Sequence, residues 1–140
     1  MAQATNRTGF TLIEVMVVLV IVAITASYAL ASYRRYLLRG YRLEAVESLL
    51  TAAAEQEKFY LAHGRYSDML AELRIPSITP RRRYEIAIEL ADARVFKIVA
   101  MPLPDGGQTD DKDCRQFSID ESGRRRSGDS AGNDSTNRCW

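Results

Sequence analysis

The chain has 140 residues, of which 46% are hydrophobic and 26% are charged, and its 19 basic and 18 acidic side chains give a formal net charge of +1. This length suits one small domain with an anchor and is too short for two independent cores. Because the charges nearly balance, they predict no general attraction to nucleic acid or anionic lipid, which leaves only local patches to consider.

The first element is an apolar run over residues 10–31, in which Glu14 is the one acidic or basic side chain. A helix of about 22 residues is about 33 Å long, which is enough to cross the hydrocarbon core of a membrane. An acidic group at mid-membrane costs roughly 2.5–3.5 kcal/mol on insertion scales, so its presence indicates a functional site. The alternative is an ordinary anchor whose carboxylate reaches the membrane interface.

A short polar leader precedes this run. Residues 1–9 contain one cation, Arg7, and end in Gly9, which is followed directly by Phe-Thr-Leu-Ile-Glu. This pattern resembles the class III signal of type IV pilins and pseudopilins. The resemblance implies that a prepilin peptidase cuts between Gly9 and Phe10, that Phe10 becomes N-methylated, and that Glu14 acts in filament assembly. An ordinary secretory signal fits poorly, because the apolar run is too long and no small-residue cleavage site follows it.

Residues 32–63 continue with helical periodicity. Ala52 to Ala54 favour a helix, Gly40 is a weak point that predicts a bend, and Gly64 is expected to end the helix. The apolar positions that recur at spacings of three, four and seven, and so predict the buried stripe, are Val46, Leu49, Leu50, Ala53, Tyr60 and Leu61.

The remaining residues, 64–140, predict a connector followed by a small antiparallel sheet. The segment 84–90 alternates, which places Tyr84, Ile86, Ile88 and Leu90 on one face. Second and third strands are expected over residues 95–101 and 114–120, with a hairpin tip at residues 92–93. Residues 122–138 are rich in Gly, Ser, Asn, Asp and Arg and are expected to be nearly disordered unless they are tied down.

Cys114 and Cys139 are the two cysteines of the chain. With a single histidine present, they do not form a structural zinc site. Given the export signal, a disulfide bond in an oxidising compartment is expected, and closing this loop stabilises the fold by roughly 3–4 kcal/mol. The arginines that follow the apolar run, Arg34, Arg35, Arg39 and Arg42, would place the head in the cytoplasm by the positive-inside rule. The leader and the cysteines predict the opposite orientation.

Further motifs extend the resemblance. Residues 57–60 and 64–67 look like the helix-end pattern of minor pilins. The Cys-Trp ending at residues 139–140, with residues 117–120 and Gly123 after the first cysteine, is similar to PilE-type minor pilins of type IVa pili. The resemblance implies an α+β, pilin-like fold in which a long N-terminal helix packs on a small antiparallel sheet with a C-terminal disulfide loop. The four expected segments are the leader (1–9), the transmembrane and filament-core helix (10–31), the upper amphipathic helix (32–63), and the connector, sheet and disulfide-bounded region (64–140).

The function that this resemblance implies is that of a minor pilin, a structural subunit of type IV pilus assembly in adhesion and twitching motility. The expected partners are prepilin peptidase, other major and minor pilins, and inner-membrane assembly machinery. The subunit is expected in the inner membrane with a periplasmic head before assembly, and in an extracellular filament afterwards. In the filament Glu14 would pair with the N-terminal amine of Phe10, which offsets its desolvation.

The chain departs from many type IVa pilins at two helix positions. Ala23 and Ala31 stand where those proteins carry Gly and Pro, the residues linked to local melting of the helix in the fibre. Because alanine favours a helix strongly, we predict a more continuous helix whose soft spots are Thr25, Ser27 and Gly40.

Two alternatives belong to the same class of protein. A pseudopilin of a type II secretion system shares the start of the chain, but Cys114, Cys139 and the Cys-Trp ending favour the pilus. A DNA-binding competence minor pilin is the second alternative, because two basic clusters would contact phosphates if both faced one side. These clusters are Arg81, Arg82 and Arg83, and Arg124, Arg125 and Arg126. The plainer interpretation is a pair of solvated turns balanced by nearby aspartates.

Catalytic motifs are not evident. His63 is expected to cap a helix end, and the sequence contains neither a nucleophile elbow nor metal-spaced His, Asp and Glu residues. Asp105, Asp110, Asp111 and Asp113 suggest calcium, but their spacing is not that of an EF-hand. The sequence therefore predicts a non-enzymatic protein without a metal or cofactor.

Overall fold

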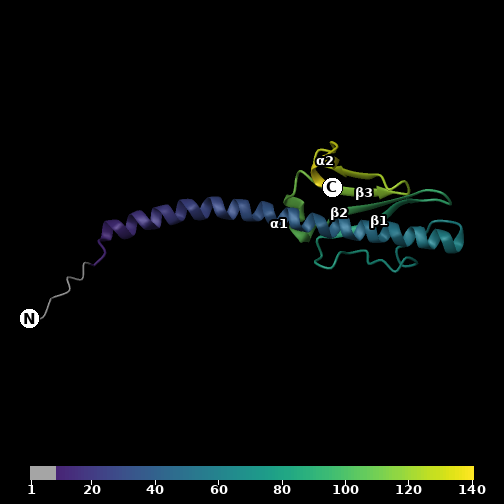
Figure 1. Ribbon diagram of the computed structural model, residues 1–140, viewed down its shortest axis with the longest axis horizontal. Helices are drawn as coiled ribbons and strands as arrows, with labels where there is room; N and C mark the ends of the chain where they lie inside the picture. The colour runs from purple at the N-terminus through teal and green to yellow at the C-terminus, as the bar shows by residue number, and fades with distance from the viewer. Residues whose placement is uncertain (1–8) are drawn as a thin grey trace, which may run out of the picture. The chain divides into compact units, whose positions relative to one another are not determined.

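The computed structural model describes residues 9–140 (Figure 1). Residues 1–8 of the expected leader lie outside the described part of the chain. The chain divides between Leu37 and Leu38 into two compact units. We call residues 12–37 the apolar segment and residues 38–140 the head, and we describe each by itself.

A single helix, α1 (Leu12–His63), contributes to both units. It begins after Thr11, whose hydroxyl accepts a hydrogen bond from the Glu14 amide at 3.3 Å, as an N-cap residue does. The helix is unbroken at Ala23 and Ala31, as predicted, and it continues through Gly40, the predicted weak point. A glycine within one turn of good helix formers costs only about 1 kcal/mol, which neighbouring contacts readily offset.

The helix ends where the sequence predicts. Gly64 has a φ of 71°, in the left-handed region, and its amide donates to the Tyr60 carbonyl at 2.8 Å. This is the αL cap that glycine forms without steric cost. His63 lies in the last turn, and its ring stacks on Phe59 with 4.0 Å between the centroids.

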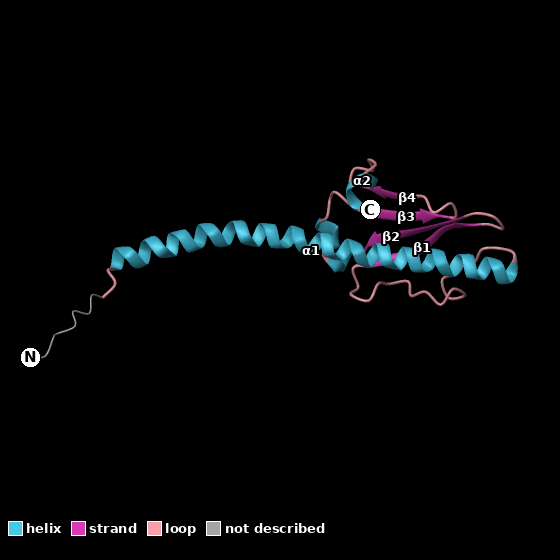
Figure 2. Ribbon diagram, viewed as in Figure 1, coloured by secondary structure: helices cyan, strands magenta, loops and turns pink. Residues whose placement is uncertain are grey.

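The head contains one antiparallel sheet of four strands in the order β1-β2-β3-β4 (Figure 2). The strands are β1 (Tyr84–Ala91), β2 (Phe96–Pro102), β3 (Gln116–Asp120) and β4 (Arg125–Gly128). Two short 3₁₀ turns, η1 (Pro104–Gly106) and η2 (Gln108–Asp110), lie between β2 and β3, and α2 (Thr136–Cys139) follows β4. Both β4 and α2 fall in the segment that the sequence predicts to be nearly disordered unless tied down.

The first strand changes face before its end. Ile88 pairs with Ile98 and Leu90 with Lys97, so Glu89 is an extra residue in β1. This bulge reverses the alternation, and Leu90 turns to the outer face with 53% of its surface exposed. The prediction that Leu90 shares the inner face with Tyr84 and Ile86 is therefore wrong.

The core lies between the inner face of the sheet and one stripe of α1. Helix residues Ala45, Leu49 and Ala52 are fully buried, as are Ile98 and Phe117 of the sheet. The stripe continues at Gln56, whose side chain is buried and bonds both backbone groups of Ser67. Because the stripe follows spacings of four, three and four, Leu50 and Leu61 fall outside it and are exposed, contrary to prediction.

The connector between α1 and β1 extends the sheet by a short stretch. Ile78 forms an isolated antiparallel bridge with Glu85. The Ile86 amide donates to the Ser77 carbonyl at 2.7 Å, and the Thr79 amide donates to the Tyr84 carbonyl at 3.0 Å. The connector is thereby fixed along the β1 edge, opposite the β4 edge.

A disulfide bond joins Cys114 to Cys139, with 5.7 Å between their Cα atoms. Trp140 follows directly, and its indole N–H donates to the Arg126 carbonyl at 2.8 Å. Its ring also meets Phe117 edge to face at 6.0 Å. The disulfide and Trp140 tie the last segment to β3 and β4, so this segment is ordered despite its polar composition.

Candidate assembly and nucleic-acid-binding sites

Glu14 lies in the first turn of α1, next to Phe10 and Thr11. The spacing of Thr11 and Glu14 is that of a capping box, and the half of it in which Thr11 accepts the Glu14 amide is formed. A carboxylate in the first turn also favours the positive end of the helix dipole. Phe10 is 85% exposed, so its backbone amine is accessible once the leader is removed. The Glu14 carboxylate thus stands in the first turn of α1, at the positive end of the helix dipole.

The apolar segment exposes hydrophobic side chains on all sides. Its most hydrophobic window has a mean hydropathy of 2.4 and no buried residue, and α1 is long and apolar enough to cross a membrane. Two polar side chains within it bond their own helix: Thr25 donates to the Ile21 and Val22 carbonyls, and Ser27 to the Ala23 carbonyl. Lipid or neighbouring helices can therefore cover this part of the surface without leaving these two hydroxyl groups unpaired.

The first basic cluster is built into the packing of the head. The Arg83 guanidinium lies 4.3 Å from the Tyr41 ring centroid and donates to the Gly106 carbonyl. The Arg81 guanidinium lies 5.9 Å from the same ring. A Cβ atom at Gly106 would meet the Arg82 carbonyl at 2.9 Å, so this backbone approach needs glycine. These contacts explain Arg81 and Arg83 as parts of the fold.

The second basic cluster lies on the β3–β4 hairpin and borders a hollow on the sheet. Arg125 packs over Trp140, at 5.5 Å from the ring centroid. Arg124 and Arg126 line the hollow together with Lys97, a cation of β2 that the sequence analysis missed. The hollow measures about 180 Å³, and its other lining residues are Ser118, Ile119 and Asp120. Three cations around one hollow favour an anion such as a phosphate.

Three carboxylates near the hollow reduce its positive charge. Burial raises the pKa of Asp120, but hydrogen bonds from Ser122 and the Arg124 amide lower it by more. The net pKa of Asp120 therefore lies below its ordinary value. Hydrogen bonds from Thr136 lower the pKa of Asp134, with a smaller contribution from the charge of Arg126. Lys97 forms an ion pair with Glu89 at 2.7 Å. The hollow is thus a mixed site, in which the lining side chains alone, three cations and Asp120, carry an excess of positive charge.

The two basic clusters do not form one patch. Arg83 directly precedes Tyr84, which pairs with Pro102, whereas Arg125 pairs with Ile119 at the other end of the strands. Since β1 and β4 are opposite edges of the sheet, the clusters occupy diagonal corners. The two clusters are therefore separate sites on the head, and the possible DNA contact of both stays a prediction.

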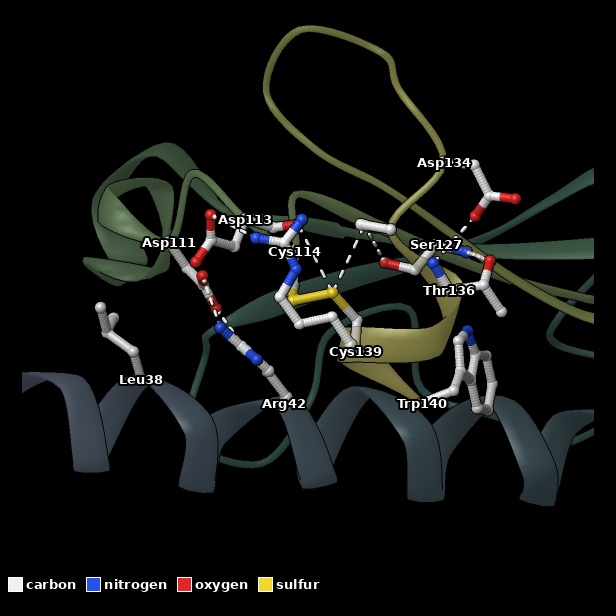
Figure 3. The surroundings of a disulfide bond; sticks show 12 residues. Leu38, Arg42, Asp111, Asp113, Cys114, Ser127, Asp134, Thr136, Cys139 and Trp140 are labelled. Carbon is white, nitrogen blue, oxygen red and sulfur yellow. Dashed lines mark hydrogen bonds and ion pairs between the residues drawn. A yellow bond between two sulfur atoms is a disulfide. The ribbon is translucent and has the colours of Figure 1, made fainter.

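A buried ion pair links α1 to the β2–β3 connection (Figure 3). Arg42 Nε donates to Asp111 Oδ2 at 2.7 Å, and Arg42 Nη2 to Asp111 Oδ1 at 2.9 Å. Gln108 bridges the pair to the helix, because its Nε2 donates to the Leu38 carbonyl at 3.0 Å and to Asp111 Oδ2 at 3.2 Å. Burial raises the pKa of nearby Tyr84, as does the charge of Asp111. We call Arg42, Asp111 and Gln108 the buried clamp.

Local sequence patterns do not predict the buried clamp. In the sequence, Arg42 is one of the arginines that follow the apolar run, and Asp111 is one of four aspartates that suggest calcium. Among residues 9–140, no group of three or more His, Cys, Asp or Glu residues is arranged to hold a metal ion. Asp113 lies 3.4 Å from Arg138, and the His63 ring nitrogen lies 3.0 Å from the Phe59 carbonyl. These residues therefore have structural contacts of their own.

Two family models match the sequence of this chain. Residues 31–118 match the model of a family described as type IV minor pilin ComP, DNA uptake sequence receptor. Residues 4–30 match the prokaryotic N-terminal methylation motif. The chain belongs to this family of type IV minor pilins. The predictions of a type IV pilin and of a minor pilin are confirmed.

Individual relatives agree with this assignment. The type IV major pilin protein PilA of Myxococcus xanthus is 32% identical over 103 residues, which are 73% of this chain and 46% of PilA. A type IV major pilin protein PilE1 of Neisseria gonorrhoeae is 38% identical over 64 residues, which are 46% of this chain and 39% of PilE1. The chain thus spans about half the length, or less, of these two curated relatives.

A solved structure supports the fold. The non-core minor pilin PilV of Neisseria meningitidis is 18% identical and superimposes with a TM-score of 0.50 over 65% of this chain and 87% of PilV. The predicted α+β, pilin-like fold with its C-terminal disulfide is therefore confirmed. The family is one of structural pilins, for which motility and adhesion are typical.

Proposed function

We propose that this chain is a processed minor subunit of type IV filaments, and that its head binds DNA. Prepilin peptidase would cut between Gly9 and Phe10 and methylate Phe10, and residues 10–31 would anchor the subunit with its head in the periplasm. Inner-membrane assembly machinery would then insert it among other pilins in the extracellular filament. The observation that carries the assembly proposal is the apolar segment, whose hydrophobic side chains need apolar surroundings.

Glu14 would set the position of the subunit along the filament. Its carboxylate lies in the first turn of α1, four residues after Phe10, whose amine would become the N-terminus on cleavage. In the filament interior, pairing with that amine or a neighbour's amine would offset the cost of burying the charge. Domain boundaries follow from this role, since residues 10–31 form the part buried in membrane or filament and residues 32–140 carry the exposed functions.

Two Glu14 variants and one Thr11 variant separate assembly from helix capping. Glu14→Gln keeps the shape of the side chain and one oxygen that can accept a hydrogen bond, but it removes the charge. Glu14→Ala removes the charge and the side-chain oxygens together. Thr11→Ala removes only the hydroxyl that caps the helix. We expect Glu14→Gln and Glu14→Ala to reduce the subunit in sheared filaments at least tenfold, and Thr11→Ala to have little effect. Mass spectrometry of the filaments measures this, and a methylated N-terminal Phe10 peptide reports processing. Normal incorporation of Glu14→Gln would contradict the assembly role.

The hollow formed by Lys97, Arg124 and Arg126 supports the DNA-binding part of the proposal. These three cations surround Ser118, a small residue that leaves room for a phosphate. The matching family is described as a DNA uptake sequence receptor, which favours nucleic acid as the source of that phosphate. Arg81, Arg82 and Arg83 would at most make secondary contacts, because Arg81 and Arg83 pack on Tyr41.

Gel retardation by the processed full chain in detergent micelles tests DNA binding. We expect retardation at low salt, with Lys97→Ala and Arg126→Ala each weakening binding and lowering the salt slope by about 1. Arg81→Ala is the matched control and should have a smaller effect. Absence of binding at low salt would remove the DNA proposal and leave filament assembly standing.

A further inference from the structure

A groove separates the head part of α1 from the connector that follows it, which Figure 2 shows as a loop beside the helix. Its volume is about 190 Å³, several times the roughly 30 Å³ that one water molecule occupies in the liquid. It can therefore admit an amino-acid side chain. The residues that line it are Glu44, Glu47, Ser48, Thr51, Ile75, Pro76, Ile78, Thr79 and Pro80.

The walls of this groove are fixed in advance. On one side stands the regular helix α1, and on the other the connector is held to β1 by the Ile78–Glu85 bridge and by the bonds of Ser77 and Thr79. Pro76 and Pro80 restrict the backbone further. A groove that needs little ordering on binding loses little entropy when it is filled.

The charge of the groove has one sign. Glu44 and Glu47 are its charged lining residues, and the others are apolar or carry a hydroxyl group. Glu44 Oε1 accepts the Arg81 amide at 2.8 Å. Glu44 Oε2 is buried and has no hydrogen-bond partner within the described part of the chain. A buried carboxylate oxygen without a partner is costly, and a cation in the groove would relieve that cost.

We propose that this groove binds a lysine or arginine side chain of a neighbouring pilin subunit. This inference rests on the proposed filament function. The aliphatic stem of the incoming side chain would lie along Ile75, Pro76 and Ile78, and its charged end would meet the two carboxylates. DNA is not a candidate occupant, because phosphates and carboxylates repel each other.

The position of the groove suits a repeating contact. The groove borders the β1 edge of the sheet, whereas Arg124 and Arg126 lie on the β4 edge. A neighbouring subunit can therefore occupy the groove without covering the cations that the proposed function assigns to DNA. A groove that takes a side chain from a different surface of its neighbour makes a heterologous contact, which generates an open helical filament where the rotation between neighbours does not close a ring.

Photo-crosslinking of the full chain in filament-forming cells tests the proposal. Benzoylphenylalanine replaces Thr51, an exposed residue of the groove, and the same replacement of Lys58 on α1 is the control outside it. In purified filaments, the Thr51 probe should attach to a pilin peptide that contains a lysine or arginine, and mass spectrometry maps the attachment. The Lys58 probe should not attach to that peptide.

A charge-neutralising pair then tests the mechanism. Glu44→Gln with Glu47→Gln keeps the shape of the groove, and we expect the Thr51 crosslink yield to fall about tenfold or more, the loss that removing a paired charge produces. Glu55→Gln with Glu57→Gln also removes two negative charges from α1, but outside the groove, and should leave the crosslink yield unchanged. Thermal melts establish that both double variants fold.

The outcomes are separable. An unchanged Thr51 crosslink in the groove double variant, or attachment to an acidic or neutral segment, to lipid or to a protein that is not a pilin, would overturn this inference while the filament function stands. Absence of the unmodified chain from purified filaments would overturn the proposed function, and the inference with it.

Discussion

The apolar segment and the head use hydrophobic side chains in opposite ways. In the segment, Val18 is 54% exposed and Leu19 is 61% exposed, although both are as hydrophobic as core residues. In the head, Leu49, Ile98 and Phe117 are fully buried. Burying apolar surface contributes about 25 cal/mol per Å², so the head stabilises itself, whereas the segment gains this energy only from lipid or other subunits.

The comparison shows that sequence hydrophobicity alone does not locate the core. Residues 10–31 are the most hydrophobic part of the chain, yet the core forms where moderately apolar residues of α1 meet the sheet. Stability of the head and insertion of the segment should therefore respond to different substitutions.

The largest expected effect contrasts one residue from each region. Phe117→Ala removes a fully buried ring that contacts Tyr84 and Trp140 edge to face, and should destabilise the head by about 3–5 kcal/mol. Val18→Ala should leave the melting of the head unchanged, because Val18 belongs to the apolar segment. Thermal unfolding of the full chain in micelles, followed by circular dichroism, measures both. Equal shifts would show that the two regions are not independent.

The buried clamp tests whether the head depends on polar contacts as well. Arg42→Ala leaves Asp111 buried with an unpaired charge and should cost about 3–5 kcal/mol. The double variant Arg42→Met with Asp111→Leu removes both charges and should recover most of that loss. Denaturant unfolding gives the two values. A double variant as unstable as Arg42→Ala would show that the shape of the clamp matters more than its charges.

Removing the disulfide compares the polar segment, residues 122–138, with the rest of the head. Cys114→Ser with Cys139→Ser should lower stability by about 3–4 kcal/mol, since the bond closes a loop between residues 25 positions apart. Residues 122–138 should lose protection from hydrogen exchange first, because this polar segment buries few side chains. Uniform loss of protection over the whole head would contradict this order.

The smallest expected effect is a pH dependence confined to the same polar segment. Hydrogen bonds from Asn133 and nearby amides lower the pKa of Asp129, and those from Thr136 lower the pKa of Asp134. A carboxylate whose folded pKa is depressed stabilises above its unfolded pKa of about 3.9 and loses this contribution as the pH falls through the folded value. Melting temperatures should fall below about pH 4, and Asp129→Asn should reduce the slope. An unchanged slope in that variant would contradict the assignment.

Local sequence signals predicted most of the fold. A glycine at position 64 predicted the helix end, because glycine adopts the αL conformation that is observed there. Alternation at residues 84–88 predicted the first strand. The bulge at Glu89 has no local signature, and it moved Leu90 to the outer face. The strand β4 was missed because its Arg-Arg-Ser-Gly sequence has no apolar alternation, and its order comes from pairing with β3 and from Trp140.

The candidate sites were predicted less completely. Arg124, Arg125 and Arg126 were found because they are adjacent in sequence, but Lys97 joins them through strand pairing, which composition does not reveal. The buried clamp joins residues 69 positions apart in the chain. The acidic groove likewise depends on where the connector lies against α1. Contacts of this kind follow from tertiary structure, so a single sequence does not contain a signal for them.

The strand order has a consequence for how the head folds. Each strand pairs with the one before it in the chain, so no strand waits for a distant segment before joining the sheet. Connections of this kind close short loops, and topologies rich in such local pairings fold faster than those with long-range crossovers. We therefore expect the sheet to form before oxidation, with Cys114 and Cys139 already neighbours when their bond is made. An oxidase acting on this chain would then seal a nearly native head rather than direct its folding.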